Sequence, residues 1–414
     1  MTSNPSSALA IHGGTPVRSA PWPAWPQWDE REREALLGVL ESGRWWATEG
    51  DRVAAFEAAF AEFSGVRHCI AVTNGTHAIE VALLGLGIGE GDEVIVTDYS
   101  FFASASAVVA VNAVPVLVDI DPHTFCIDPG AVAAAITPRT RAVVAVHIAG
   151  HPCDLDALGA LCTQRGIALV EDCAHAHGSQ WNGRPVGSIG DAGTFSFQQS
   201  KLLTAGEGGA ITVREDAPAA DIRSFADCGR RPGEWFYRHF VLGGNFRLSE
   251  WQGAMLLAQL QRFPAQHARR NANALVLNEA LRGIPGVVPQ ARDQRTTSQG
   301  YYCYLVRIDE DAFGLPRDVV REALVAEGIP MTMSYPEIHA LDAFTDPAGF
   351  APRQRNRYAR PDYAAQALPV TREMARTTLW CRHSLLMGTR EDALALGEAL
   401  AKIHAHRDAL RGQA

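Results

Sequence analysis

Apolar residues in the first half of the chain follow two alternating patterns. Short continuous runs of Val, Ile, Leu and Ala are separated by stretches in which apolar residues recur at helical spacing. Buried strands that alternate with helices are typical of a mostly parallel sheet with helices on both faces. We therefore predict an α/β fold, with strands at 68–72, 93–96, 114–120, 141–147 and 167–173.

The segments outside this pattern predict how the chain is divided. Residues 1–28 are rich in Pro and Trp and have no period, so we expect an extended arm that crosses another surface, such as that of a partner subunit. Helical periodicity covers 30–62 and 249–282, and a strand-like run at 301–308 followed by helical patterns predicts a smaller α+β domain. We expect an N-terminal arm at 1–28, a large domain at 29–270 and a small C-terminal domain at 271–414.

Composition and charge exclude several classes of protein. With 47% hydrophobic and 20% charged residues, the 414-residue chain is typical of a folded globular protein, not of a disordered one. It has no apolar run long enough to cross a membrane, and its start lacks the features of a signal peptide, so we expect a cytoplasmic protein with no membrane partner. The net charge of −9, without any Lys/Arg-rich stretch, argues against nucleic acid. The eight cysteines form no C-x-x-C pair, and we expect reduced, mostly buried thiols.

Lysine is almost absent from the chain. Only Lys201 and Lys402 are lysines among the 37 basic residues, and the others are arginines. A guanidinium does not lose its proton in proteins, so arginine cannot replace a lysine whose amine must attack a carbonyl. Lys402 falls in a helical pattern near the C-terminus and is expected on a solvated helix face. Lys201 lies in a glycine-rich loop between two strand-like runs, at 193–197 and 209–213, and is the candidate nucleophile.

Two further candidates follow predicted strands, at the sheet edge where α/β proteins bind ligands. Thr76 comes after an Asn-Gly turn at the start of a helix, where it serves either as a phosphate site or as a plain helix cap. Asp172 ends a buried strand and needs a partner, either a cationic pyridinium nitrogen or a structural ion pair or helix cap. A phosphate cradle, an acid and the lysine at position 201 together are what pyridoxal phosphate requires.

Two other patterns predict neither a metal site nor a dinucleotide site. His175 and His177 stand two residues apart in a predicted loop without a nearby thiol pair, so we expect no metal. The glycine run at 85–93 follows a helix and leads into a strand, and Glu90 and Asp92 stand where a dinucleotide motif needs glycine. We interpret the run as a helix stop and a turn.

Five motifs make the chain resemble a known family. They are TNGTHA, VHIAG, EDCAHAHG, SFQQSKLLTAGEGG and GGNFRLSEWQGA. In this order and spacing they are similar to the DegT/DnrJ/EryC1/StrS sugar aminotransferases, which are fold-type-I enzymes that use pyridoxal phosphate. The resemblance spans residues 20–405. It implies that Lys201 binds the cofactor covalently and that Asp172 pairs with its pyridine nitrogen.

The resemblance also implies further cofactor contacts. His175 stands where the family has Gln or His near the phenolic oxygen. Phe101 matches an aromatic residue that stacks on the cofactor ring, although a core Phe would look the same in sequence. Asn245 matches an Asn that reaches the phosphate in the neighbouring subunit, which implies a homodimer with shared active sites. The residues implied at the phosphate are Gly75, Thr76, His77 and Ser196.

The reaction implied is amino transfer from L-glutamine or L-glutamate. A dehydratase branch of the family has His in place of the lysine, which is present here. PWPAWPQW and CRHSLLMG are more similar to two branches than to the nucleotide-sugar enzymes: the cyclitol branch, which aminates scyllo-inosose and 2-deoxy-scyllo-inosose for aminocyclitol antibiotics, and 3-amino-5-hydroxybenzoate synthase. CIDPGAV and LSEWQGAMLLAQL favour the cyclitol branch, whereas TNGTHA, AHAHG and FADCGR favour 3-amino-5-hydroxybenzoate synthase. That alternative therefore stays open, beside nucleotide keto-sugars.

Substrate recognition is less clearly marked. Thr97 and Asp98 depart from the residues that both branches carry before the aromatic residue, so the acceptor is not defined by the sequence. The donor carboxylate needs a cation, and the candidates are Arg382, with His383 nearby, and Arg230, together with Arg231 and Arg238. Two other classes of function stay open: a regulator that binds pyridoxal phosphate without amino transfer, and a lyase or racemase on the same fold.

Overall fold

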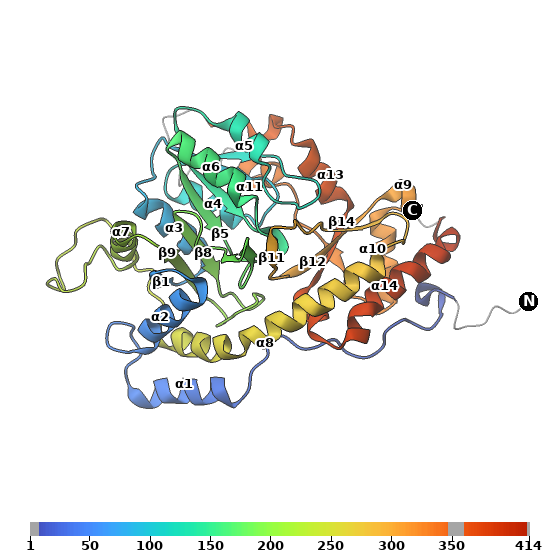
Figure 1. Ribbon diagram of the computed structural model, residues 1–414, viewed down its shortest axis with the longest axis horizontal. Helices are drawn as coiled ribbons and strands as arrows, with labels where there is room; N and C mark the ends of the chain where they lie inside the picture. The colour runs from blue at the N-terminus through green and yellow to red at the C-terminus, as the bar shows by residue number, and fades with distance from the viewer. Residues whose placement is uncertain (1–7, 347–359, 412–414) are drawn as a thin grey trace, which may run out of the picture.

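The computed structural model describes residues 8–346 and 360–411. Its centre is a seven-stranded sheet in the order β1-β9-β8-β5-β4-β2-β3, in which β9 alone runs antiparallel to its neighbours (Figure 1). The sheet is mostly parallel, and the predicted α/β class is confirmed. The strands are β1 (His68–Val72), β2 (Glu93–Thr97), β3 (Val114–Val118), β4 (Thr140–Val146), β5 (Ala168–Asp172), β8 (Ala192–Ser196) and β9 (Gly209–Val213).

Helices cover both faces of this sheet. Side chains alternate between the two faces of each strand, and both faces carry apolar side chains that must be buried. On β1, Ile70 and Val72 belong to the apolar cluster that includes α3 and α7, whereas Cys69 and Ala71 belong to the cluster around Phe56 of α2. Both faces are therefore buried, as the continuous apolar strands predicted. The helices of this part are α2 (Arg52–Ser64), α3 (Gly75–Gly85), α4 (Ala103–Ala110), α5 (Pro129–Ala135), α6 (Leu155–Arg165) and α7 (Asp216–Ala226).

The long helix α8 (Glu250–Leu281) connects the central sheet to the C-terminal part (Figure 1). It begins at a capping box formed by Ser249 and Gln252, and it contacts α1 and α2 at one end and α14 at the other. A four-stranded antiparallel sheet follows, so the predicted C-terminal α+β region is present. Its main elements are β10 (Val287–Pro289), β12 (Cys303–Ile308), α10 (Arg317–Ala326), β13 (Thr332–Met333), α13 (Pro369–Thr377), β14 (Thr378–Arg382) and α14 (Arg390–Ala405).

Smaller elements complete the fold. The helical pattern at 30–62 becomes α1 (Glu30–Ser42) and α2, because Gly43 takes a left-handed conformation at the end of α1. The domain boundary expected at residue 270 falls inside α8, so the exact division stays a prediction. A small sheet joins β6 (Gln180–Trp181), β7 (Arg184–Pro185) and β11 (Thr296–Ser298), and two short helices are α9 (Glu310–Phe313) and α11 (Asp342–Thr345).

The N-terminal arm packs against its own chain over its described residues, 8–28. The backbone N–H groups of Ala10 and Val17 donate to the carboxylate of Glu327, which is also bound by Lys402 at 2.8 Å. The Lys402 amine donates a second bond to the carbonyl of Thr15 at 2.7 Å. The expectation of a solvated Lys402 is therefore wrong: the helix pattern identified its helix but not the arm that covers it.

All eight cysteines are free, and all except Cys228 are buried. Within 8–346 and 360–411, no helix combines the length and the apolar character needed to span a bilayer.

Candidate active site

A cavity of about 630 Å³ lies at the edge of the central sheet where β1, β5 and β8 end. These strands run in the same direction, so the residues that follow them meet at one edge. The sequence-predicted residues that line this cavity are Gly75, Thr76, His77, Phe101, Asp172, Ser196 and Lys201.

Lys201 projects from the loop between β8 and β9. Its Nζ lies 4.3 Å from the centre of the Tyr302 ring, on the cavity wall. Burial of the amine lowers the pKa of Lys201 to about 8, although the negative charge of Asp172 opposes this shift. About a tenth of the amine is therefore unprotonated at pH 7, far more than for an ordinary lysine, and this is the form that attacks a carbonyl.

Asp172 is the last residue of β5 and is only 5% exposed. Its Oδ2 accepts a hydrogen bond from Ser104 Oγ at 2.8 Å, and its Oδ1 accepts one from the backbone N–H of Ala174 at 3.1 Å. In the described part of the chain, no cationic side chain forms an ion pair with it. A buried carboxylate in this situation fits a protonated pyridine nitrogen, which would supply the missing positive charge.

The N-terminus of α3 also lines the cavity. Asn74 caps this helix by accepting a hydrogen bond from the backbone N–H of His77 at 2.8 Å. A Cβ on Gly75 would lie 2.7 Å from Cβ of Ser196, so only glycine allows α3 to approach β8 this closely. The helix start and the hydroxyl groups of Thr76 and Ser196 therefore face one space, and this donor set fits a phosphate.

Phe101 lines the cavity, whereas His175 is packed outside its lining. Phe101 is 57% exposed, so it is not a core residue. His175 is buried and stacks on Tyr302, with ring centres 4.2 Å apart, and its Nε2 lies 3.2 Å from the hydroxyl of Tyr335. Burial lowers the pKa of His175 well below its usual value, so the ring is neutral.

Tyr302 and Tyr335 line the cavity but were missed by sequence reasoning. Tyr302 directly precedes β12, and its place at the start of the predicted 301–308 strand was an available signal. Tyr335 lies in a segment with no periodic pattern, and nothing in the sequence marked it.

Asp98, which with Thr97 differs from the residues of both related branches, helps to place Tyr335 on the cavity. Asp98 is fully buried, and its carboxylate accepts a hydrogen bond from the backbone N–H of His339 at 2.8 Å and contacts His339 Nδ1 at 2.7 Å. Burial raises the pKa of Asp98, and His339 partly offsets this. The pair therefore anchors the segment that carries Tyr335, four residues before His339.

Glu171, the residue before Asp172, holds the end of β5 in place. It accepts hydrogen bonds from the backbone N–H groups of Gly187, Ile189 and Gly190, and lies 3.0 Å from His147 Nε2. Burial alone would raise the pKa of Glu171, but these bonds lower it. His147, Glu171 and Cys173 are close enough to hold a metal, yet both ring nitrogens of His147 already have hydrogen-bond partners in the chain.

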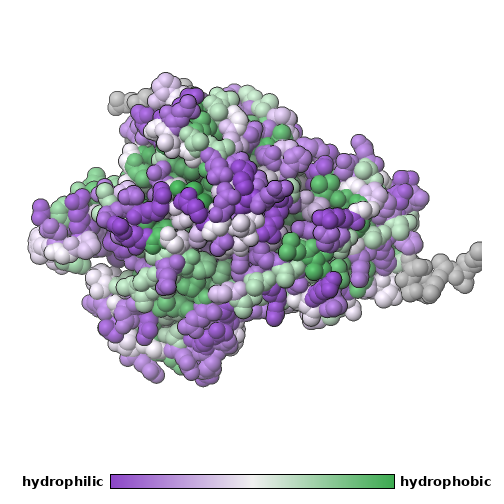
Figure 2. Space-filling model, in the orientation of Figure 1, coloured by the Kyte–Doolittle hydropathy of each residue, from purple (hydrophilic) through white to green (hydrophobic). Residues whose placement is uncertain are grey.

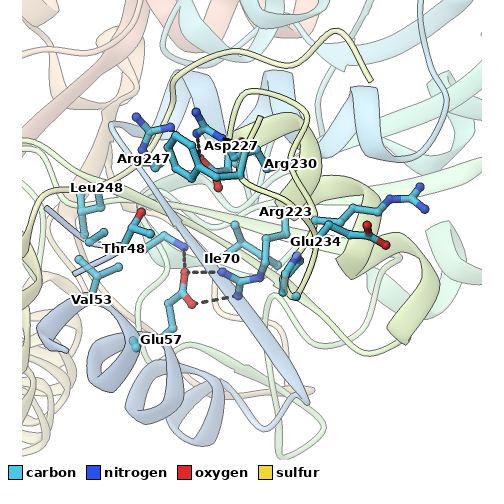
Figure 3. Close-up of a pocket in the computed structure, with 18 of the residues that line it drawn as sticks. Thr48, Val53, Glu57, Ile70, Arg223, Asp227, Arg230, Glu234, Arg247 and Leu248 are labelled. Atoms are coloured by element: carbon cyan, nitrogen blue, oxygen red, sulfur yellow. Dashed lines mark hydrogen bonds and ion pairs between the residues drawn. The ribbon is translucent and has the colours of Figure 1, made fainter. Parts of the chain in front are cut away.

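Asn245 and Arg230 do not line the cavity of their own chain. Asn245 is exposed, in a bridge to Asp227. Arg230 lines a second pocket, of about 370 Å³, where it and Arg247 both donate to Oδ1 of Asp227, at 3.0 and 2.7 Å (Figure 3). The neighbouring loop arginines are paired as well, Arg231 with Asp221 and Arg238 with Glu234.

Arg382 and His383 are also outside the cavity lining. Arg382 is exposed at the end of β14. His383 is 1% exposed, and its Nε2 lies 3.2 Å from the backbone oxygen of Ser200. Neither side chain reaches the cavity wall in this arrangement.

Comparison with known proteins agrees with this geometry. The model of the DegT/DnrJ/EryC1/StrS aminotransferase family matches residues 26–381. The chain is 44% identical to L-glutamine:2-deoxy-scyllo-inosose aminotransferase of Streptoalloteichus tenebrarius, over 97% of this chain and 99% of that one. It is 40% identical to 3-amino-5-hydroxybenzoate synthase of Amycolatopsis mediterranei, over 93% and 98%. The crystal structure of 3-amino-5-hydroxybenzoic acid synthase has a TM-score of 0.84 and 37% identity, over 94% of this chain and 100% of that one.

The family match covers most of the chain and includes all the residues that line the cavity. Aminotransferases of this family depend on pyridoxal phosphate, and the phosphate donors, the buried acid and the lysine fit that cofactor. The chain belongs to the DegT/DnrJ/EryC1/StrS family and is a pyridoxal-phosphate-dependent aminotransferase.

Proposed function

We propose that this enzyme transfers the amino group of L-glutamine to the ketone of a keto-cyclitol of the 2-deoxy-scyllo-inosose type, in aminocyclitol antibiotic biosynthesis. The observation that carries the proposal is the 44% identity, along nearly the whole of both chains, to an L-glutamine:2-deoxy-scyllo-inosose aminotransferase. The identity to the 3-amino-5-hydroxybenzoate synthase is lower, at 40%, and that activity is the alternative.

We assign the residues of the cavity the following roles. Pyridoxal phosphate, when bound, withdraws electrons from the carbon that carries the amino group. Lys201 would hold the cofactor, and its amine would move a proton from the α-carbon of the donor. Asp172 would keep a proton on the ring nitrogen, and Phe101 would stack on the ring. His175 would support the phenolic oxygen through Tyr335, whose hydroxyl lies 3.2 Å from His175 Nε2. Gly75, Thr76, His77 and Ser196 bind the phosphate.

The acceptor is tested by supplying L-glutamine with one ketone at a time. We expect an amino-cyclitol from 2-deoxy-scyllo-inosose, identified by mass spectrometry. We expect little product from a nucleotide-linked keto-sugar, because its diphosphate needs an anion site of its own, which a cyclitol does not need. Preference for the nucleotide-linked ketone would contradict the acceptor assignment. Formation of an aromatic amine, 3-amino-5-hydroxybenzoate, from a ring that can lose water would favour the alternative. Binding of the cofactor without turnover of any ketone would indicate a regulator.

We further propose that the enzyme is a homodimer with shared active sites. On the loop that ends at Asn245, Trp235 is 72% exposed and Leu242 is fully exposed. Trp45 adds another exposed ring, which contacts Trp251 at the start of α8. Figure 2 shows hydrophobic side chains gathered over α2 and the start of α8. Clustered apolar groups of this kind are typical of protein interfaces.

In this dimer, Asn245 completes the phosphate site of the partner subunit, and Arg230 on the same loop contributes a cation toward the donor carboxylate there. Arg382, at the exposed end of β14, is the second candidate for this carboxylate. His383 is buried against the Lys201 loop, so we place it behind the site and not at the substrate. We also propose a cytoplasmic location, which suits eight free thiols.

Mixing two damaged variants tests the shared site. Lys201→Ala and Asn245→Ala, each strongly impaired alone, should regain activity after subunit exchange, because one of the two sites in each mixed dimer carries both native residues. Random exchange predicts recovery to about a quarter of the wild-type rate. Mixing Lys201→Ala with Asp172→Asn is the matched control, since these two residues belong to the same chain's site and should give no recovery. Absence of recovery in the first mixture would contradict the shared site.

A further inference from the structure

The N-terminal arm reaches the loop that carries Lys201. The indole Nε1–H of Trp25 donates a hydrogen bond to the backbone carbonyl of Gln199 at 3.0 Å. Gln199 stands two positions before Lys201 in the chain. The arm is anchored just beyond this contact, because the side-chain amide of Gln259 on α8 donates to the carbonyl of Gln27 at 2.9 Å.

His383 contacts the same loop from the C-terminal part of the chain. It is the first residue of a short 3₁₀ helix, His383–Met387, and its Nε2 lies 3.2 Å from the carbonyl oxygen of Ser200. Burial lowers the pKa of His383 to about 3, so the ring is neutral and Nε2 carries the hydrogen that this bond needs. The ring also meets the Trp25 indole edge to face, with ring centres 4.4 Å apart.

These two contacts act on consecutive peptide groups directly before Lys201. Gln199 and Ser200 lie outside any helix or strand, so no regular hydrogen-bond pattern orients their carbonyls. The hydroxyl of Ser200 also lies 2.9 Å from that of Tyr302, whose ring faces the Lys201 amine. The backbone and the side chain of Lys201 are thus both oriented by groups from distant parts of the chain.

We propose that Trp25 and His383 are positioning residues that fix the Lys201 amine for reaction with the cofactor. The contacts join three segments that are separate in sequence: the N-terminal arm, the Lys201 loop and the start of the 3₁₀ helix after β14. Neither side chain lines the cavity, so both act through the loop. The proposal rests on the proposed role of Lys201 as the lysine that binds pyridoxal phosphate.

The test measures how fast the full-length protein, stripped of cofactor, attaches pyridoxal phosphate. Attachment is followed by visible absorption, and its site is located by peptide mass after borohydride reduction. Trp25→Phe keeps an aromatic ring against His383 but removes the N–H donor. We expect it to slow attachment at Lys201 about 3- to 10-fold, the effect of losing one neutral hydrogen bond, with a fall in Tm of no more than a few degrees.

Trp22→Phe is the matched control. Trp22 is on the same arm, and its Nε1–H donates to the carbonyl of Gly328 at 2.9 Å, away from the Lys201 loop. We expect wild-type attachment from this variant. Equal slowing by both substitutions would indicate general loosening of the arm and overturn the proposal, and so would a wild-type rate in Trp25→Phe.

A second pair of variants decides the matter if Trp25→Phe does not fold. His383→Gln places an amide N–H near the position of Nε2, whereas His383→Met fills the space without a donor. We expect slow attachment in the Met variant and recovery of most of the rate in the Gln variant, and identical rates in the two would overturn the proposal. If the wild-type protein attaches no cofactor at Lys201, the proposed role of Lys201 fails instead.

Discussion

Replacing Lys201 by alanine is expected to lower the rate of amino transfer from L-glutamine by about 10³-fold or more. The substitution removes the amine that lies 4.3 Å from the Tyr302 ring and whose pKa is lowered to about 8 by burial. Without it, the cavity loses the amine to which we assign the transfer of the proton from the donor α-carbon. The measurement is single-turnover release of the keto acid from glutamine, with cofactor added in excess.

Two further lysine variants make this prediction specific. Lys201→Arg keeps a positive charge but cannot supply an unprotonated amine, so it should be as inactive as the alanine variant. Lys402→Arg changes the other lysine, whose partners are Glu327 and Thr15, and should retain wild-type turnover. A Lys201→Arg variant with more than about a tenth of wild-type activity would show that charge, and not a reactive amine, is what position 201 contributes.

Asp172→Asn is expected to lower kcat/KM for L-glutamine by roughly 10²- to 10³-fold. The amide matches the carboxylate in shape but carries no negative charge, so it cannot hold a proton on the ring nitrogen of the cofactor. Cofactor affinity should fall less than turnover, because the phosphate contacts at α3 are untouched. Steady-state kinetics and a cofactor titration on the same preparation separate the two effects.

Ser104→Ala is the control for this variant. It removes the hydrogen bond to Asp172 Oδ2 but leaves the charge in place, so we expect only about a 3- to 10-fold loss. If Asp172→Asn were no worse than Ser104→Ala, Asp172 would be a structural residue of the strand end and not the partner of the ring nitrogen.

The residues that sequence reasoning located are those whose position depends on local structure. Thr76 and Asp172 each stand at or just after the end of a strand, and parallel strands bring such ends to one edge of the sheet. Ser196, which the family resemblance implied, ends β8 at the same edge. Lys201 was found because arginine had replaced nearly every other lysine, which makes a retained lysine informative.

The residues that were missed depend on packing between distant segments. Tyr335 reaches the cavity because His339 binds Asp98, 241 residues earlier in the chain, and no periodic pattern records such a pair. Lys402 was misplaced for the same reason, since the arm that covers it is contributed by the N-terminus. The surroundings of His383 likewise depend on the arm, whose sequence has no periodic pattern from which its contacts could be predicted.

The most direct test of the account is the visible absorption spectrum of the purified enzyme before and after L-glutamine is added without an acceptor. We predict that glutamine bleaches the band of the bound cofactor, that 2-deoxy-scyllo-inosose restores it, and that Lys201→Ala shows neither change. A band that persists with L-glutamine, L-glutamate and L-alanine alike, or a Lys201→Ala variant that responds as the wild type does, would contradict the assignment of amino transfer to this site.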